Sequence, residues 1–203
     1  MRLGVLFSGG KDSNYAMFKA SKSNNIKVLI SIFSENEDSY MFHTQDIENV
    51  KVQSKKLKIP LLIKKTKGIK EKELIDLKEA VKEAKEKFKI EGIVTGAIAS
   101  NYQASRVKQI CDELNLESVN PLWGYDQLTL LKELVENNFK VKIVKVAADG
   151  LEEEKWIGKI IDKEAIEGLD RLSKKYGFNV AFEGGEAETI VIGSPMFKTF
   201  IKE

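Results

Sequence analysis

Short apolar runs alternate with helix-like stretches through residues 1–120, and this alternation constrains the fold more than any other feature of the chain. The apolar runs are typical of buried strands and lie at residues 3–7, 26–34, 59–65 and 92–96. Between them, residues 46–57 and the lysine-rich residues 64–91 show helical periodicity. Strands that alternate with helices predict an α/β fold, in which a Rossmann-like parallel sheet carries helices on both faces.

Beyond residue 120 this alternation is lost. The later pattern predicts a helix at residues 126–137, a strand at 140–148 and a helix at 163–176. We therefore expect an N-terminal domain of residues 1–120 and a small C-terminal α+β subdomain of residues 121–203. No low-complexity linker separates them, so we expect the two parts to pack closely.

The composition is that of a globular chain. Of its 203 residues, 42% are hydrophobic and 32% charged, and no apolar run reaches the roughly eighteen residues of a membrane span. The 33 basic and 31 acidic residues interleave, so the chain has no strong positive electrostatic field that would favour binding of a nucleic acid. We expect neither a membrane nor a nucleic acid as partner, leave a homo-oligomer open, and expect a cytoplasmic protein because the chain begins directly with a strand.

The segment SGGKDS lies between the first expected strand and the first helix. At such a turn the first helical N–H groups lack partners, the helix dipole adds positive charge, and glycine lets an anion approach closely. The segment does not match the common P-loop motif G-x-x-x-x-G-K-[ST], because Val5 stands at the position of the first glycine and Asp12 at that of the Ser or Thr. The alternative is a plain turn with Ser8 or Asp12 as the helix cap. The residues expected to hold nucleotide phosphates are Ser8, Gly9, Gly10, Lys11, Asp12 and Ser13, together with Ser34 at the end of the second strand.

A second polar segment, GAIASNYQASR, leaves the fourth strand and enters a helix. Ligands of parallel sheets gather beyond the carboxyl ends of the strands, so we expect this segment beside SGGKDS. Ordinary helix capping by Ser100 or Asn101 is the alternative. The candidate substrate-binding residues are Ser100, Tyr102, Gln103 and Arg106, and we add the aromatic residues Trp123 and Tyr125.

A third segment, FEGGEAET, places Glu183, Glu186 and Glu188 within six residues of one another. Carboxylates this close repel each other, which favours a site for a cation: Mg²⁺, an ammonium ion or an alkylated nitrogen of a substrate. The alternative is a solvated acidic hairpin.

Cysteine and histidine each occur once. Cys111 shares a helical face with Val107, Ile110 and Leu114, which favours a buried hydrophobe over a nucleophile. For His43, a solvent-facing loop position and a place in the site both remain open.

Six segments in a fixed order carry a resemblance through the whole chain: LFSGGKDSNYA, MFHT, GAIASNYQASRVKQIC, NPLW, VKIVKVAADGL and FEGGEAET. They resemble the diphthine–ammonia ligase (diphthamide synthetase) family of the PP-loop N-type ATP pyrophosphatases. The resemblance implies a PP-loop, HUP-type ATP-binding domain at residues 1–120 and a substrate-binding subdomain at 121–203. It also implies that ATP and ammonium are used to amidate diphthine on translation elongation factor 2, with release of AMP and pyrophosphate.

In this interpretation Lys11 and Asp12 act on the leaving pyrophosphate, Asp12 holds Mg²⁺, and one of the three C-terminal glutamates takes a proton from ammonium. The sequence departs from the family pattern at Ala187, where an aromatic residue is usual, and at Ala104, where a larger residue is common. Two other functions stay open: a PP-loop enzyme that modifies tRNA, and a protein that senses ATP without consuming it.

Overall fold

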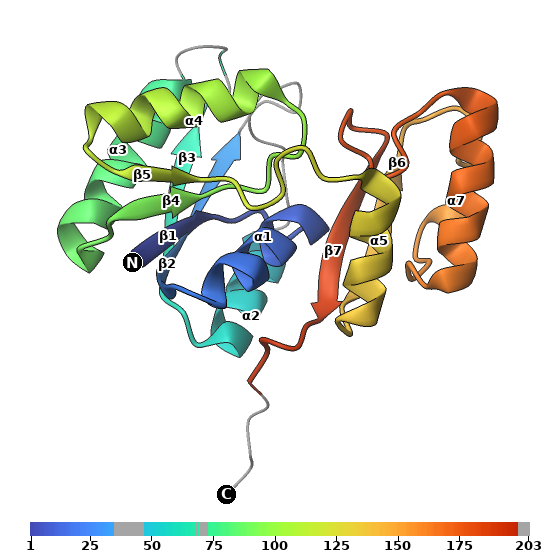
Figure 1. The fold of residues 1–203 in the computed structure, drawn as a ribbon, viewed down its shortest axis with the longest axis horizontal. Helices are drawn as coiled ribbons and strands as arrows, with labels where there is room; N and C mark the ends of the chain where they lie inside the picture. Colours follow the sequence, from blue (N-terminus) through green and yellow to red (C-terminus); the bar gives the residue numbers. More distant parts are fainter. Residues whose placement is uncertain (35–46, 68, 70–72, 199–203) are drawn as a thin grey trace, which may run out of the picture.

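The computed structural model describes residues 1–34, 47–67, 69 and 73–198. Its main sheet has five parallel strands in the order β3-β2-β1-β4-β5 (Figure 1). These strands are β1 Arg2–Leu6, β2 Asn25–Ser34, β3 Leu61–Thr66, β4 Gly92–Val94 and β5 Glu117–Val119. The chain runs outward from β1 to β3 and then returns to the other side of β1, so the topological switch point lies between β1 and β4.

Helices cover both faces of this sheet, as the sequence predicts. Leu29 and its neighbours in β2 alternate between two cores: Leu29 packs in the core shared with α1 and α2, and Ile30 in the core shared with α3 and α4. Being apolar on both sides, the central strands are buried on both faces. The four helices are α1 Lys11–Ser21, α2 Ile47–Leu57, α3 Glu73–Phe88 and α4 Asn101–Glu113.

The C-terminal part is a small α+β unit, which confirms the predicted class. Its two strands pair in an antiparallel sheet, and α5 packs on α7 (Figure 1). The core that contains Leu3 of β1 continues to Val191 of β7, so the two parts share one hydrophobic core. The division near residue 120 stays a prediction. The elements are α5 Gln127–Glu136, β6 Lys140–Val146, α6 Glu153–Trp156, α7 Lys163–Tyr176 and β7 Ala187–Gly193.

Two strands and one helix are absent from the sequence-based expectations. The strands β5 and β7 and the single-turn helix α6 are short or irregular in their apolar pattern, so periodicity does not reveal them. His43, for which the sequence leaves a loop position and a place in the site open, lies outside the described residues. Within the described ranges, none of the helices is both long and apolar enough to cross a membrane.

Candidate functional site

A pocket of about 260 Å³ opens at the carboxyl ends of β1, β2 and β4, at the switch point of the sheet. It is lined by parts of all three polar segments that the sequence singles out, including Lys11, Gln103 and Glu188. Gly96 lets the end of β4 approach α1, since a Cβ there would lie 2.9 Å from the backbone of Asp12. The three polar segments therefore lie together at one edge of the sheet, as predicted.

The N–H groups of the loop before α1 donate to hydroxyl groups of residues that line the pocket. Gly9 has a φ of +79°, which favours glycine, and the N-cap Gly10 receives no side-chain cap. The Gly10 N–H donates to Ser8 Oγ at 3.3 Å, and the Lys11 N–H donates to Thr189 Oγ1 at 3.2 Å. Neither Ser8 nor Asp12 is the N-cap of α1, so the plain capped turn does not describe this loop.

Lys11 and Asp12 form a partly buried ion pair in the pocket wall. The Lys11 side chain is only 2% exposed, and its Nζ lies 2.8 Å from Asp12 Oδ2 and 5.6 Å from the centre of the Phe182 ring. Asp12 Oδ1 is buried and has no hydrogen-bond partner in the described part of the chain. A buried cation with helix N–H groups fits a polyphosphate, and an unused carboxylate oxygen beside it fits a metal ligand.

Glu183 ties the C-terminal part to the loop that follows β4. Its Oε1 accepts hydrogen bonds from the N–H groups of Ile98, Ala99 and Ser100 at 3.1–3.2 Å. Ser100 is also the N-cap of α4, accepting from the Gln103 N–H at 3.4 Å. Capping by Ser100 is therefore real, and the same segment also lines the pocket through Gln103.

The other two glutamates have different surroundings. Glu186 accepts from the N–H groups of Asn179 and Gly184 at 2.9 and 2.8 Å, and so closes its own turn outside the pocket lining. Glu188, on β7, lines the pocket, and its Oε1 lies 3.4 Å from the exposed Lys145 Nζ. Of the three carboxylates, Glu183 and Glu188 border the pocket.

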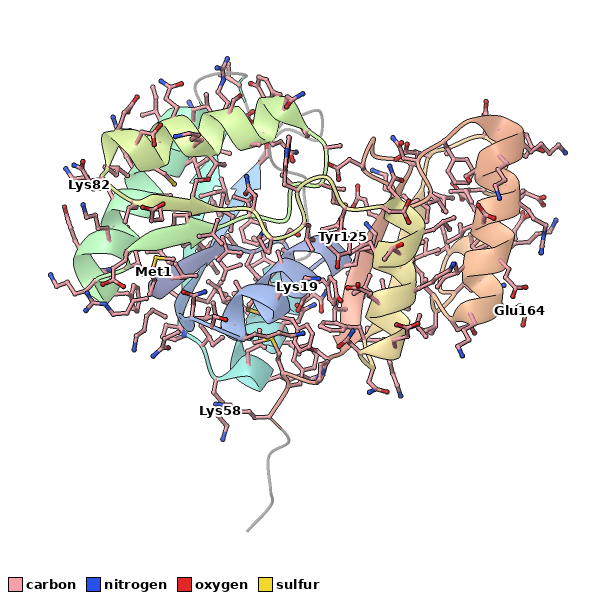
Figure 2. The ribbon with its side chains drawn as sticks, viewed as in Figure 1. Met1, Lys19, Lys58, Lys82, Tyr125 and Glu164 are labelled. Atoms are coloured by element: carbon pink, nitrogen blue, oxygen red, sulfur yellow. The ribbon has the colours of Figure 1, made fainter. Side chains whose placement is uncertain are left out.

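Eight predicted site residues lie outside the described pocket lining, and their roles stay predictions: Gly9, Ser34, Ser100, Tyr102, Arg106, Trp123, Tyr125 and Glu186. Ser34 is buried at the end of β2, and Trp123 is 45% exposed. The Arg106 guanidinium lies 5.2 Å from the centre of the Tyr102 ring. Tyr125 faces α1 and α5 instead: Lys19 Nζ lies 4.4 Å from the centre of its ring (Figure 2).

Cys111 is buried among apolar residues of α4 and its neighbours. Burial raises the pKa of its thiol to about 11. The predicted buried position is confirmed, and the absence of a nucleophilic role stays a prediction.

Sequence reasoning missed Gln53, Asn14, Thr189 and Phe182, all of which contact the loop or its lysine. One signal was present for Gln53, since it lies on the apolar face of a predicted helix between Val50 and Leu57. A polar side chain at such a position needs a buried partner.

A parallel sheet with a glycine-containing strand-to-helix loop at its switch point is the architecture of nucleotide-binding α/β proteins. The sequence profile of the diphthamide synthase N-terminal domain matches residues 1–118, and that of the diphthamide synthase C-terminal domain matches residues 126–202. The chain belongs to the diphthamide synthase family. This membership confirms the predicted family and the predicted enzyme class, an ATP-dependent ligase.

Individual relatives agree with the profiles. The chain is similar to the diphthine–ammonia ligase of Homo sapiens, with 36% identity over 98% of this chain and 81% of the relative. It is 30% identical to that of Saccharomyces cerevisiae over 98% of this chain, but spans only 34% of the yeast protein. A solved structure described as a predicted tRNA methyltransferase subunit, from Methanocaldococcus jannaschii, aligns with a TM-score of 0.49 at 19% identity, covering 96% of this chain and 98% of the other. A likeness this weak carries no argument about function.

Proposed function

We propose that the chain amidates diphthine on translation elongation factor 2 to diphthamide, with ATP as the activating reagent and ammonium as the nitrogen donor. One observation carries the proposal beyond family membership: the buried Lys11 ammonium and the Glu188 carboxylate line the same pocket. One pocket therefore contains a cation suited to a leaving polyphosphate and a carboxylate suited to a cationic group.

In the first step a carboxylate oxygen of diphthine attacks the α-phosphorus of ATP. The bond from that phosphorus to the bridging oxygen breaks, and pyrophosphate leaves with the electron pair. No general base is needed, because the attacking carboxylate is already ionised. The Lys11 ammonium would stabilise the charge that grows on pyrophosphate, as would the N–H groups of Gly10 and Lys11 once pyrophosphate replaces the hydroxyl groups of Ser8 and Thr189 as their acceptors.

The residues around Asp12 also fit Mg²⁺. Its buried Oδ1 would be the protein ligand, while Oδ2 stays paired with Lys11. When bound, the ion would neutralise part of the phosphate charge.

In the second step ammonium loses a proton, the nitrogen of the resulting ammonia attacks the acyl carbon, and the bond from that carbon to the AMP oxygen breaks. The nitrogen then releases a second proton to give the amide. Glu188 is our candidate for the proton acceptor. Oε1 of Glu183 and both carboxylate oxygens of Glu186 accept backbone N–H groups, whereas the partner of Glu188 is an exposed lysine side chain. Its negative charge would also attract ammonium to the pocket.

We further propose that residues 121–203 contact the protein substrate. The exposed Trp123 ring is suited to attract the quaternary ammonium of diphthine through a cation–π contact. Tyr102 and Arg106, on the first turns of α4, would meet the substrate at the pocket rim.

The test is to incubate the chain with ATP, Mg²⁺, ammonium and elongation factor 2 that carries diphthine. Amidation replaces a carboxyl hydroxyl group by an amino group, which makes the factor slightly lighter. We expect this loss of mass only when ATP and ammonium are both present. A parallel incubation contains tRNA in place of the factor, and adenylation of the tRNA with no change in the factor would favour a tRNA-modifying enzyme. ATP binding without AMP formation from any of these substrates would favour a sensor.

A further inference from the structure

Two amide side chains, Gln53 on α2 and Asn14 on α1, form a buried bridge behind the phosphate loop. Gln53 is 1% exposed and Asn14 is fully buried, and neither lines the pocket. Amides in such a position cost free energy unless their hydrogen bonds are made, so their partners indicate what the bridge holds.

The partners are the carbonyl groups of the loop and of β7. Gln53 Nε2 donates to the Gly9 carbonyl at 2.9 Å and to the Val191 carbonyl at 2.8 Å. Asn14 Nδ2 donates to the Gly10 carbonyl at 3.0 Å and to Gln53 Oε1 at 3.1 Å. Carbonyl oxygens only accept, so this arrangement fixes which end of each amide faces the loop.

Holding these two carbonyl groups determines where the next two N–H groups point. In a trans peptide the C=O of one residue and the N–H of the next point in opposite directions, and the described residues contain no cis peptide. With the Gly9 and Gly10 carbonyls turned toward the amides, the N–H groups of Gly10 and Lys11 turn the other way. There they meet Ser8 Oγ and Thr189 Oγ1, both on residues that line the pocket.

The Gly9 carbonyl also accepts the Val191 N–H at 3.1 Å, so Gln53 supplies one of two hydrogen bonds that hold this peptide. The Gly10 carbonyl also accepts from the Asn14 N–H and from Ser13 Oγ, both at 3.2 Å. Gly9 and Gly10 lack Cβ atoms, and glycine adopts positive and negative φ about equally readily, so a flip of the peptide between them meets little steric resistance. A flipped peptide would direct a carbonyl oxygen, instead of an N–H, at the phosphates.

We propose that Gln53 is a positioning residue for cleavage of ATP, which orients the Gly9–Gly10 peptide so that its N–H faces the pyrophosphate. This inference rests on the proposed function, because it assigns pyrophosphate to this loop. Through Val191 the same amide also fixes the strand that carries Glu188, so one side chain aligns the phosphate loop with the acidic strand.

The experiment measures the affinity of the full chain for magnesium pyrophosphate and for AMP by calorimetry. In Gln53→Met the volume is kept and both donors are lost. We expect pyrophosphate to bind about tenfold more weakly, because the loop would lose one N–H hydrogen bond to the charged pyrophosphate and such a bond carries about this much free energy. AMP binding should change by less than about twofold. Gln53→Glu keeps the acceptor for Asn14 but loses the amide donors, and should also weaken pyrophosphate binding selectively.

Ser54→Ala is the matched control. Ser54 is the next residue of α2 and is also buried, but its Oγ donates to the Ile59 carbonyl at 2.7 Å, away from the loop. This variant should lower the melting temperature and leave both affinities unchanged.

Three outcomes would overturn the inference. Gln53→Met that folds and binds pyrophosphate like the wild type would show that the amide does not orient the loop. Equal losses for pyrophosphate and AMP, or unfolding of both Gln53 variants while Ser54→Ala folds, would show a role in stability alone. Wild-type protein that binds no pyrophosphate would instead remove the proposed function, and the inference with it.

Discussion

The carboxylate of Glu183 accepts the backbone N–H of Ser100 at 3.2 Å, across 83 positions of sequence. The same Oε1 also accepts from Ile98 and Ala99, so three N–H groups at the start of α4 depend on one oxygen. Negative charge is favourable there because the N-terminus of a helix carries partial positive charge. The contact joins the C-terminal acidic segment to the loop beyond β4 and closes one side of the pocket.

This contact predicts a difference between two substitutions of Glu183. Glu183→Ala leaves three N–H groups without their acceptor and should lower the free energy of unfolding by roughly 1–3 kcal/mol. Glu183→Gln keeps an acceptor oxygen and should lose less. Denaturant unfolding of both variants checks this, and equal losses would show that the oxygen does not hold the loop.

Lys11 and Asp12 are predicted to act on the chemistry of ATP. Lys11→Met and Asp12→Asn should each lower the rate of AMP formation by on the order of a hundredfold, since each removes a group that faces the developing charge. Lys51→Ala, which removes an exposed lysine of α2, should leave the rate unchanged. Wild-type turnover in folded Lys11→Met would exclude the loop lysine from the mechanism.

Glu188 is predicted to matter to nitrogen transfer and much less to ATP. Glu188→Gln keeps the size of the side chain and removes the charge, so amidation should fall at least about tenfold while ATP affinity changes little. Glu186→Gln is the comparison, because that side chain closes its own turn away from the pocket. Loss of ATP binding in Glu188→Gln would instead place a metal or nucleotide contact at this residue.

Cys111 is predicted to be dispensable for nitrogen supply. Because burial raises the pKa of its thiol to about 11, roughly one molecule in a thousand carries the thiolate at pH 8. Cys111→Ser should keep ammonium-dependent activity, and iodoacetamide should label the native wild type far more slowly than the unfolded chain. A folded but inactive Cys111→Ser, or rapid labelling of the native thiol, would contradict the buried position.

Glu133 is predicted to make stability depend on pH. The hydrogen bond from Tyr15, together with Tyr125 and Lys19, holds the pKa of Glu133 below its ordinary value of 4.5. A lowered folded-state pKa stabilises the protein fully above the unfolded value, and this contribution is lost as pH falls through the lowered pKa. The stability difference between wild type and Glu133→Gln should therefore be largest above about pH 5 and shrink toward acid. Unfolding curves that keep a constant difference down to pH 3 would contradict it.

The sequence predicts the sheet well because each of its helices and central strands buries its own apolar face. It predicts the loop at residues 8–13 because glycines, a lysine and an acid coincide at one strand end. The bridge from Gln53 to Gly9 spans 44 positions and depends on how α2 packs against the loop, which no local pattern encodes. Glu186 and Glu188 are the same residue type two positions apart, yet their roles differ because β7 begins between them, at Ala187. Glu186 lies in the turn before the strand and accepts the Gly184 N–H, whereas Glu188 lies on the strand and lines the pocket.

In the proposed reaction, the carboxylate of diphthine is activated by transfer of the adenylyl group from ATP. The direct measurement uses elongation factor 2 whose diphthine carboxylate carries a heavy isotope of oxygen, followed by mass analysis of the small products. We expect amidation to transfer one labelled oxygen to AMP and none to pyrophosphate. Label in inorganic phosphate, with ADP as the nucleotide product, or amidation without any label in AMP, would contradict it.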